Sequence, residues 1–371
     1  MKILEVTNVD FSLRHFLLPL MQGLRARGHE VVGVCAEGPL LAEVRADGFR
    51  VEAPPLARSL SPLAQARAIW SLVRLIRAER PDLVHAHMPI SGLLARLAAR
   101  LCGVRIIAYT CHGFLFNQPG SRRRRAVALL LERAAGRLTD RYFTVSDEEA
   151  ADARRLRIHA GAVAVGNGRP PATFHPDPVS RARIRTALGV PEGRVVVIVV
   201  SRLVRHKGHP ELLAAMARVP DAELWVVGDR LPSDHGETLE AAFEAAAHPA
   251  ALGPRLRRLG YRTDIPALLA AADIFALPSH FEGLPMSVIE AMLCALPVVA
   301  TAIRGPREQV VQNETGFLVP PRDVDKLAGA LGRLAADAAL RRRLGEAGRV
   351  RALALYDEAV VVSRTIALLG A

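Results

Sequence analysis

Short runs of apolar residues alternate along the chain with longer stretches in which apolar residues recur every three or four positions. The runs predict buried β-strands, and the stretches predict amphipathic helices that cover them. This alternation is typical of parallel sheets with helices on both faces. In the first half we expect strands at residues 2–9, 30–36, 83–87, 105–111, 141–146 and 162–166, and helices at 14–27, 62–79, 90–101 and 121–137.

Prolines and glycines interrupt the pattern between Gly166 and Pro178, as in a loop or linker. Beyond it the alternation resumes. We therefore expect an α/β protein with two doubly wound, Rossmann-like domains, residues 1–173 and 174–352, and a C-terminal helix at 353–371 that packs back toward the first domain. Ligands of such folds bind beyond the carboxyl ends of the strands, so the predicted site is a central cleft between the domains. Strands are expected at 195–201, 223–228, 257–260, 274–278 and 297–301, and helices at 208–218, 264–271, 285–295, 323–335 and along the tail 337–370.

Composition narrows the class of protein. The 371 residues suit two domains rather than one core. The longest aliphatic run, Val195 to Val200, is far shorter than the ~20 residues of a membrane-spanning helix. Polar residues by Asn8 argue against a signal peptide. The four cysteines show no pairing or metal spacing, which predicts a reducing, cytoplasmic location.

The net charge of +12 lies mainly in residues 1–173. Such a surplus can face nucleic acid, an anionic membrane or an anionic acceptor. Abundant arginine in an alanine-rich chain can equally be a compositional bias. Neither aromatic interleaving nor a nucleic-acid reader fold is visible, so no nucleic-acid partner is expected.

Two glutamates, Glu282 and Glu290, follow a predicted buried strand. Gly283 permits close approach of a ligand to the backbone, and Pro285 suits the first position of a helix. The amides of Gly283 and Leu284 would then favour an anion such as a diphosphate. Glu282 can accept hydrogen bonds from sugar hydroxyls, and Glu290 can accept them from a ribose. An ordinary capped helix with solvated glutamates would show the same spacing.

Two cations, Arg202 and Lys207, follow the predicted strand 195–201. At the ligand edge of a sheet they would neutralise a diphosphate leaving group, although a basic surface turn would look the same. Tyr261 and Arg262 follow another strand and could form a wall for a nucleobase. The alternative there is an ordinary helix capped at position 263 or 264.

Together, these clusters resemble the retaining glycosyltransferases of family 4, which have the two-domain GT-B fold. The resemblance covers nearly the whole second half, in order and in spacing. The matching segments are Ser201-Arg202-Leu203 with Lys207-Gly208, Val227-Gly228-Asp229, Gly260 with Asp264-Ile265, Ala272-Asp273-Ile274, Leu277-Pro278-Ser279, Glu282-Gly283-Leu284-Pro285, Glu290-Ala291-Met292, Pro297-Val298-Val299-Ala300-Thr301 and Gly316-Phe317-Leu318-Val319-Pro320.

The resemblance implies that the second domain binds a nucleotide-sugar, usually linked to UDP or GDP. Glu282 would hold the donor sugar and Glu290 the ribose, with Arg202 and Lys207 on the diphosphate. It also implies front-face attack assisted by the leaving phosphate, with no metal and no cofactor. Further residues expected around the donor are Gly228, Tyr261, Arg262, Gly283 and Leu284.

The first half resembles the family more loosely. His112 and Gly113, at the end of strand 105–111, look like the family's histidine-glycine turn, which implies that His112 contacts the donor sugar and acts in catalysis. Alternatively, His112 would satisfy local backbone. Asn167 and Gly168 resemble the asparagine-glycine turn that ends the first domain.

The loop after the first strand departs from the family pattern. Residues 7–15 contain no glycine, whereas many members carry adjacent glycines there. A glycine-free loop brings its backbone less close to a phosphate, so phosphate contact would be weaker or would come from Arg14. We expect the loop to shape the acceptor site instead. The residues predicted on the acceptor side are Asp10, Arg14, His87 and Asn167.

Two patterns that suggest metal sites are interpreted otherwise. Asp323 and Asp325 spell the Asp-x-Asp motif of metal-dependent glycosyltransferases, but they precede an amphipathic helix, so Asp323 is predicted to be its N-cap. His85 and His87 alternate along a strand. We interpret their rings as pointing to opposite faces, which would exclude a shared zinc ion. No metal site is therefore predicted.

Residues 121–137 begin with four arginines and continue as a strongly apolar segment. As a helix, this segment could lie on an anionic membrane and admit a lipid-linked acceptor. A core helix with solvated arginines at its start explains the pattern equally well.

We predict a retaining, metal-independent glycosyltransferase that moves a hexose or N-acetylhexosamine, preferably from a UDP-sugar, to a saccharide or polyprenyl-linked acceptor. The expected location is the cytoplasm or the inner face of the cytoplasmic membrane. Two alternatives share the fold class. One is an enzyme like the UDP-N-acetylglucosamine 2-epimerases, and the other is a non-catalytic scaffold that binds nucleotide-sugars.

Overall fold

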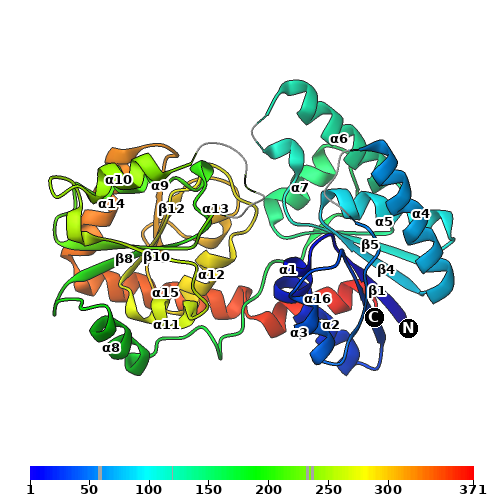
Figure 1. The fold of residues 1–371 in the computed structure, drawn as a ribbon, viewed down its shortest axis with the longest axis horizontal. Coiled ribbons are helices and arrows are strands. Elements are labelled where there is room, and N and C mark those ends of the chain that lie inside the picture. Colours follow the sequence, from blue (N-terminus) through cyan, green and yellow to red (C-terminus); the bar gives the residue numbers. More distant parts are fainter. Residues whose placement is uncertain (57–60, 119, 231–233, 235–237) are drawn as a thin grey trace. The chain divides into compact units, whose positions relative to one another are not determined.

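The computed structural model describes residues 1–56, 61–118, 120–230, 234 and 238–371. These residues form two compact units, Met1–Gly166 with Ala359–Ala371, and Asn167–Glu358. Each unit is built on a parallel sheet of its own (Figure 1). The predicted α/β class with two doubly wound, Rossmann-like sheets is therefore confirmed.

The described residues of the first unit form a seven-stranded sheet in the order β3-β2-β1-β4-β5-β6-β7. The order runs outward from β1 and β4, so these neighbours form the switch point at which doubly wound sheets bind ligands. The strands are β1 (Lys2–Val6), β2 (Glu30–Val34), β3 (Arg50–Glu52), β4 (Leu83–His87), β5 (Ile106–Cys111), β6 (Arg141–Thr144) and β7 (Val163–Ala164).

Helices cover both faces of this sheet (Figure 1). Successive strand residues point to opposite faces, so Ile3 and Leu4 enter different hydrophobic cores. One core also takes in α4 and α5, and the other takes in α2 and α16. The helices are α1 (Asp10–Ser12), α2 (Leu18–Ala26), α3 (Leu41–Ala46), α4 (Pro62–Glu79), α5 (Pro89–Leu101), α6 (Arg122–Gly136), α7 (Asp147–Arg155) and α16 (Glu358–Leu369).

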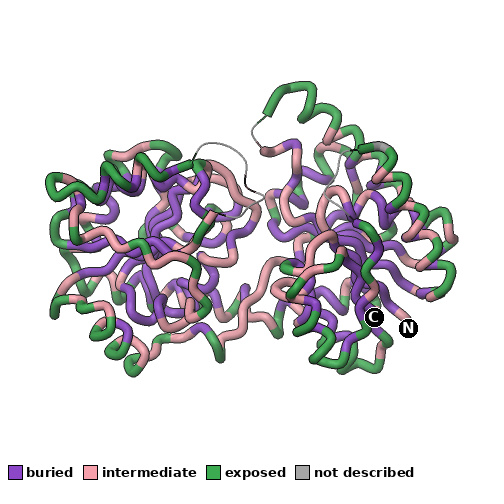
Figure 2. Tube along the Cα trace, viewed as in Figure 1, coloured by how far each residue is buried: buried purple, intermediate pink, exposed green. Residues whose placement is uncertain are grey.

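The described residues of the second unit form a six-stranded sheet in the order β10-β9-β8-β11-β12-β13, with its switch point between β8 and β11. Apart from the partly exposed edge strand β10, its strands are mostly buried (Figure 2). The elements are β8 (Val195–Val200), β9 (Ala222–Val227), β10 (Leu256–Gly260), β11 (Ile274–Leu277), β12 (Val298–Thr301), β13 (Gly316–Val319), α8 (Pro178–Ala187), α9 (His209–Met216), α10 (Glu240–Ala247), α11 (Ile265–Ala271), α12 (Met286–Leu293), α13 (Pro306–Gln309), α14 (Val324–Ala336) and α15 (Ala338–Leu355).

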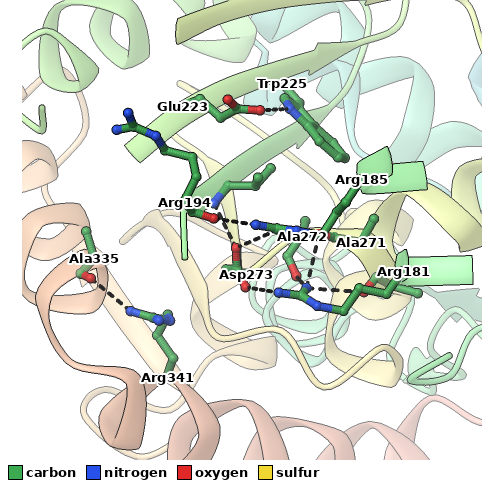
Figure 3. A network of polar contacts seen from close by, with 12 residues as sticks. Arg181, Arg185, Arg194, Glu223, Trp225, Ala271, Ala272, Asp273, Ala335 and Arg341 are labelled. Carbon is green, nitrogen blue, oxygen red and sulfur yellow. Dashed lines mark hydrogen bonds and ion pairs between the residues drawn. The ribbon is translucent and has the colours of Figure 1, made fainter. Parts of the chain in front are cut away.

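Asp273, directly before β11, organises the amino-terminal edge of the second sheet. Its carboxylate accepts hydrogen bonds from the backbone of Val196 at 2.8 Å and from Arg181 of α8 at 2.7 Å (Figure 3). Arg185 donates to the same carboxylate at 3.2 Å. Ligands bind at the opposite, carboxyl edge of such sheets, so Asp273 has a structural role.

Several predicted boundaries need correction. The edge strands β3 and β13 were not predicted: β3 has one apolar residue between two charged ones, and β13 begins with a glycine. The predicted tail helix is divided into α15 and α16 at Tyr356 and Asp357. Residues 10–26, predicted as a loop and a helix, form α1, a π-helix at Leu13–Leu17, and α2.

Candidate functional site

An ion pair joins the two segments that leave the switch point of the second sheet. Lys207 lies in a 3₁₀ turn after β8, and Glu282 lies in the loop after β11. The Nζ atom of Lys207 is 2.6 Å from Oε1 of Glu282, and both side chains are largely buried. The structure therefore brings together two of the residues that the sequence assigned to the site.

The Glu282 carboxylate is held from its own loop as well. Ser279 Oγ donates to Oε1 at 2.6 Å, and the Ser279 carbonyl accepts a hydrogen bond from Thr301 of β12 at 2.5 Å. Within the described part of the chain, both hydrogen bonds to Glu282 end on Oε1. The lone pairs of Oε2 are thus available to a hydroxyl-bearing ligand.

Close backbone approaches surround this pair. Gly228 has a φ of 124°, and a Cβ there would lie 2.1 Å from the Ser201 carbonyl oxygen. Gly305 has a φ of 79°, and its Cβ would lie 1.8 Å from the carbonyl oxygen of Gly283. Both positions require glycine for the space as well as for the backbone conformation. Gly228 and Gly283 were predicted to belong to the site from the sequence, whereas Gly305 was not.

Glu290, on α12, is buried and paired with Arg169. The Nε atom of Arg169 donates to Oε1 of Glu290 at 2.6 Å. Burial raises the pKa of Glu290, and the Arg169 guanidinium opposes that rise. Sequence reasoning missed Arg169, although it stands in the loop of glycines and prolines beside Asn167.

Asn167 belongs to the second unit, whereas the sequence analysis placed it at the end of the first domain, on the acceptor side. Its side-chain amide donates to the Leu284 carbonyl at 2.8 Å. Because Asn167 and Arg169 both bond to α12 or to the loop before it, the chain joins the second unit at Asn167 and not at residue 174.

The other side chains predicted to surround the nucleotide-sugar have partners other than Lys207 and Glu282. Arg202 forms an ion pair with Asp234. Tyr261 is exposed, and Arg262 forms a fork with Asp264 through bonds of 2.8 and 2.7 Å. Asp264 occupies the N-cap position of α11 but makes no side-chain capping bond, because Arg262 takes its carboxylate.

In the first unit, His112 lies in contact with a buried polar cluster at the ligand edge of β1, β4 and β5. Glu5 accepts hydrogen bonds from His85 Nδ1 at 3.1 Å and from His87 Nε2 at 2.8 Å. The other ring nitrogen of His87 is 3.2 Å from Nε2 of His112. His85 also bonds through Nε2 to the Thr110 hydroxyl at 2.8 Å.

This cluster corrects the interpretation of the two strand histidines. His85 and His87 lie on the same face of β4, with ring centroids 4.0 Å apart, because residues two apart in a strand share a face. The ligand atoms of these histidines and Glu5 all lie within 4.8 Å of one another. The two rings therefore do not point to opposite faces, contrary to the prediction, and the observed distances are those of hydrogen bonds.

His87 and His112 have pKa values below that of a solvated histidine. Burial, with the charge of His85, lowers the pKa of His87 to about 4. Burial, with the two neighbouring histidines, lowers the pKa of His112 to about 3. Both rings are consequently neutral at physiological pH.

The other residues predicted on the acceptor side have structural partners. Asp10 accepts hydrogen bonds from the amides of Phe11 and Leu40, at 2.8 and 3.1 Å. Arg14, in the π-helix, is 2.7 Å from a carboxylate oxygen of Glu43.

The Asp-x-Asp motif forms a helix cap. Asp323 Oδ1 accepts a hydrogen bond from the Lys326 amide at 2.9 Å at the start of α14. Asp325 pairs with Arg218. The prediction that Asp323 is an N-cap is confirmed.

Comparison with known proteins gives consistent matches in both units. Residues 180–351 match the family model described as glycosyl transferases group 1, and residues 13–168 match the glycosyl transferase 4-like domain. Over 363 residues the chain is 31% identical to UDP-Gal:alpha-D-GlcNAc-diphosphoundecaprenol alpha-1,3-galactosyltransferase of Escherichia coli, with 91% of each chain covered.

A second relative and a solved structure extend the comparison. The chain is 32% identical over 362 residues to 2-deoxystreptamine N-acetyl-D-glucosaminyltransferase of Streptomyces fradiae, covering 88% of this chain and 83% of the relative. Sucrose-phosphate synthase from Thermosynechococcus elongatus superimposes with a TM-score of 0.85 at 24% identity, covering 99% of this chain and 98% of the other. At that identity the likeness shows the fold.

Proposed function

The chain belongs to the glycosyl transferases of group 1, and we propose that it is a retaining enzyme that uses a UDP-sugar without a metal ion. It is a glycosyltransferase that takes its sugar from a nucleotide-sugar. The similar enzymes named above transfer galactose or N-acetylglucosamine, so the transferred sugar is proposed as a hexose or an N-acetylhexosamine. UDP is favoured because the Escherichia coli relative is named for UDP-Gal.

The Lys207–Glu282 pair is the observation that carries the proposal. An ammonium group has three donors, so Lys207 can bond to Glu282 and to diphosphate oxygens together. Oε2 of Glu282 can at the same time accept from a sugar hydroxyl. One ion pair would thus hold the two parts of the donor between which the bond breaks.

A cation in this place also supports metal independence. When the bond to the anomeric carbon breaks, negative charge develops on the diphosphate, and fixed donors lower the energy of that transition state. Lys207, with the amides at Gly283 and Leu284 before α12, would supply them. Arg202 would add a second cation once it exchanges Asp234 for phosphate.

Glu290, to which Arg169 donates a hydrogen bond, is proposed to accept hydrogen bonds from the ribose. The guanidinium at 2.6 Å favours the ionised carboxylate, which is the better acceptor. Arg169 is therefore added to the residues expected around the nucleoside.

The acceptor is proposed to be a saccharide on a polyprenyl diphosphate, presented at an anionic membrane surface. Val127 and Leu130 of α6 are 56% and 65% exposed, next to the exposed arginines 122–125. Apolar and cationic side chains on one helix suit an interfacial site. The Escherichia coli relative is named for a diphosphoundecaprenol acceptor.

A cavity of about 290 Å³ beside α6 supports the same proposal. It reaches the surface at Leu131, which is 48% exposed. Its apolar walls suit part of an isoprenoid chain, and it begins close to the segments that follow His87 and His112. The principal lining residues are Ile90, Leu93 and Leu94 of α5, Phe114 and Phe116 after β5, and Leu131 of α6.

Attachment of this kind would be peripheral. Among the helices of the described residues, none is both long and apolar enough to cross a bilayer. The exposed arginines and apolar side chains of α6 support our proposal that this helix lies on the inner face of the cytoplasmic membrane.

Transfer from labelled UDP-sugars to a polyprenyl diphosphate-linked N-acetylhexosamine tests the proposal. We expect product with retained anomeric configuration by NMR, in the presence of a chelator. Free sugar and UDP formed without acceptor would instead support an epimerase-like activity. Loss of activity with chelator, and its return with magnesium or manganese, would contradict metal independence.

A further inference from the structure

We infer that Glu5 and His87 fix the tautomer of His112, placing its proton on Nε2 and its lone pair on Nδ1. His112 would then act as a hydrogen-bond acceptor toward a sugar hydroxyl. Glu5 and His87 are positioning residues in this inference, because they act through His112. The role of His112 toward the donor sugar rests on the proposed function, whereas its tautomer does not.

The hydrogen bonds form a continuous chain from β1 to the turn after β5. Glu5 Oε2 is 2.8 Å from His87 Nε2, and His87 Nδ1 is 3.2 Å from His112 Nε2. Glu5 aligns with His85 in the register of β1 and β4, and His87 follows two residues later on the same face. The fold therefore places Glu5, His87 and His112 at the edge of the sheet where ligands of doubly wound folds bind.

The direction of each hydrogen bond follows from donor counting. An ionised carboxylate only accepts, so His87 must carry its proton on Nε2. A neutral imidazole has one N–H, which leaves His87 Nδ1 as an acceptor. The facing Nε2 of His112 must then donate. Since His112 is also neutral, its Nδ1 carries no proton.

The surroundings of Glu5 and His87 favour an ionised Glu5 carboxylate and a neutral His87 ring. Burial by itself would raise the pKa of Glu5, but the charge of His85 and the hydrogen bonds from both histidines lower it to about 2. The reverse chain would require a protonated Glu5 or a charged His87, and the lowered pKa values of both groups disfavour it.

The free end of the chain can meet a ligand. His112 is half-buried, and no residue in the described ranges bonds to its Nδ1. The Phe16 ring, 6.2 Å from the His112 ring between centroids, lies beside it. A lone pair in this setting accepts from a hydroxyl and gains nothing from an ether, a phosphate or a carbonyl oxygen. The ligand group is therefore a hydroxyl or an N–H, and under the proposed function we assign it to a hydroxyl of the donor sugar.

The first experiment measures the tautomer itself in the complete chain. Long-range ¹H–¹⁵N spectra of protein labelled with ¹⁵N-histidine distinguish protonated from unprotonated ring nitrogens, and His112→Ala identifies the His112 signals. We expect a proton on Nε2 and none on Nδ1. A proton on Nδ1, or a metal ion on His85 or His87 in metal analysis of the purified protein, would overturn the inference.

The second experiment measures what the lone pair does. Replacing the contacted hydroxyl of the donor sugar by hydrogen, position by position, should lower kcat/KM about tenfold at one position in the wild-type enzyme. In His87→Phe this discrimination should disappear, because His112 is no longer held in one tautomer. His159→Phe is the matched control, since it makes the same replacement in the same unit at a histidine that stacks on Tyr142 and bonds to the Thr139 carbonyl, leaving Glu5, His85 and the His87–His112 bond in place.

The two experiments separate the possible failures. If the tautomer is as stated but the discrimination is the same in His87→Phe and wild type, the positioning role is wrong. If no nucleotide-sugar is a substrate, the proposed function fails, while the tautomer measured by NMR still decides this inference.

Discussion

Lys207 and Glu282 form a 2.6 Å ion pair across the switch point of the second sheet, although they are far apart in the sequence. Each follows a strand that is central to the sheet, β8 or β11, and the two loops are joined by a hydrogen bond from the His280 amide to the His206 carbonyl at 2.8 Å. The pair is thereby fixed in place before a ligand arrives. Such preorganisation is what electrostatic stabilisation of a leaving group requires.

Removing either charge of this pair should lower kcat more than it changes donor binding. For Lys207→Ala we expect kcat to fall by about 10²–10³-fold, the loss typical of one preorganised donor in a transition state. Glu282→Gln keeps the shape and removes the charge, and we expect a comparable loss. Steady-state kinetics with a UDP-sugar measure both.

A control outside the site separates this effect from general damage. Arg218→Ala removes a cation of an exposed ion pair with Asp325 and should leave kcat unchanged. Lys207→Ala with unaltered kcat would count against the assignment of Lys207 to the diphosphate.

Gly305 supports the site because its missing side chain leaves room for the Gly283 carbonyl. We expect its substitution to lower both activity and stability. In Gly305→Ala the new Cβ would lie 1.8 Å from the Gly283 carbonyl oxygen, at a φ of 79°. The loop of Glu282 and Gly283 must shift, so we expect lower activity together with about 2 kcal/mol or more of lost stability. Thermal unfolding and kinetics on the same preparation test this.

Gly329→Ala is the matched control for that substitution. Gly329 lies in α14, and nothing is within 4 Å of its ideal Cβ. A helix interior favours alanine over glycine by about 0.5–1 kcal/mol, so this variant should be slightly more stable and fully active. Equal behaviour of the two variants would contradict the steric argument.

Sequence reasoning succeeded where the place of a residue follows from the strand before it. Lys207, Glu282 and His112 lie just beyond β8, β11 and β5, as expected, while their roles stay predictions. The doubly wound fold followed from the alternation of strands and helices. The contacts that were not predicted join residues that are far apart in the sequence. Arg169 bonds to Glu290 across 121 positions, and no local period reveals such a pair.

Other predictions differ from the structure for separate reasons. The alternation of β4 was misapplied to His85 and His87, which share a face because they are two residues apart. Asp264 satisfies Arg262 in place of the helix cap that its position suggested. Asn167 bonds to Leu284, so the unit boundary falls before the turn that was expected to end the first domain.

The Arg169–Glu290 pair gives a prediction of pH-dependent stability. Burial raises the folded-state pKa of Glu290 above its ordinary value of 4.5, and Arg169 limits that rise. A raised carboxyl pKa means that the folded state binds more protons than the unfolded state. Stability is therefore lost as pH rises from the unfolded pKa through the folded pKa. Arg169→Met should extend this loss to higher pH.

At pH 7 we expect Arg169→Met to destabilise the fold by about 3–5 kcal/mol, because the variant leaves a buried carboxylate unpaired. The double variant Arg169→Met with Glu290→Leu removes both charges and should recover most of that stability. Urea unfolding between pH 4.5 and 8 measures each variant. A single variant with the same pH profile as wild type would show that the pair is not coupled in the folded state.

Binding to anionic membranes should depend on the arginines at the start of α6. In Arg122→Gln with Arg123→Gln, two exposed cations are lost beside the exposed Val127 and Leu130. Each arginine near an anionic surface contributes about 1 kcal/mol, so the affinity for vesicles with anionic lipid should fall about 30-fold. The loss should be greatest at low ionic strength, since salt screens exposed charges.

Arg342→Gln with Arg343→Gln makes the same change of charge on α15, at exposed positions, and should leave vesicle binding unaltered. Vesicle co-sedimentation of both variants decides between a specific α6 surface and attraction by net charge, because equal losses would support net charge alone.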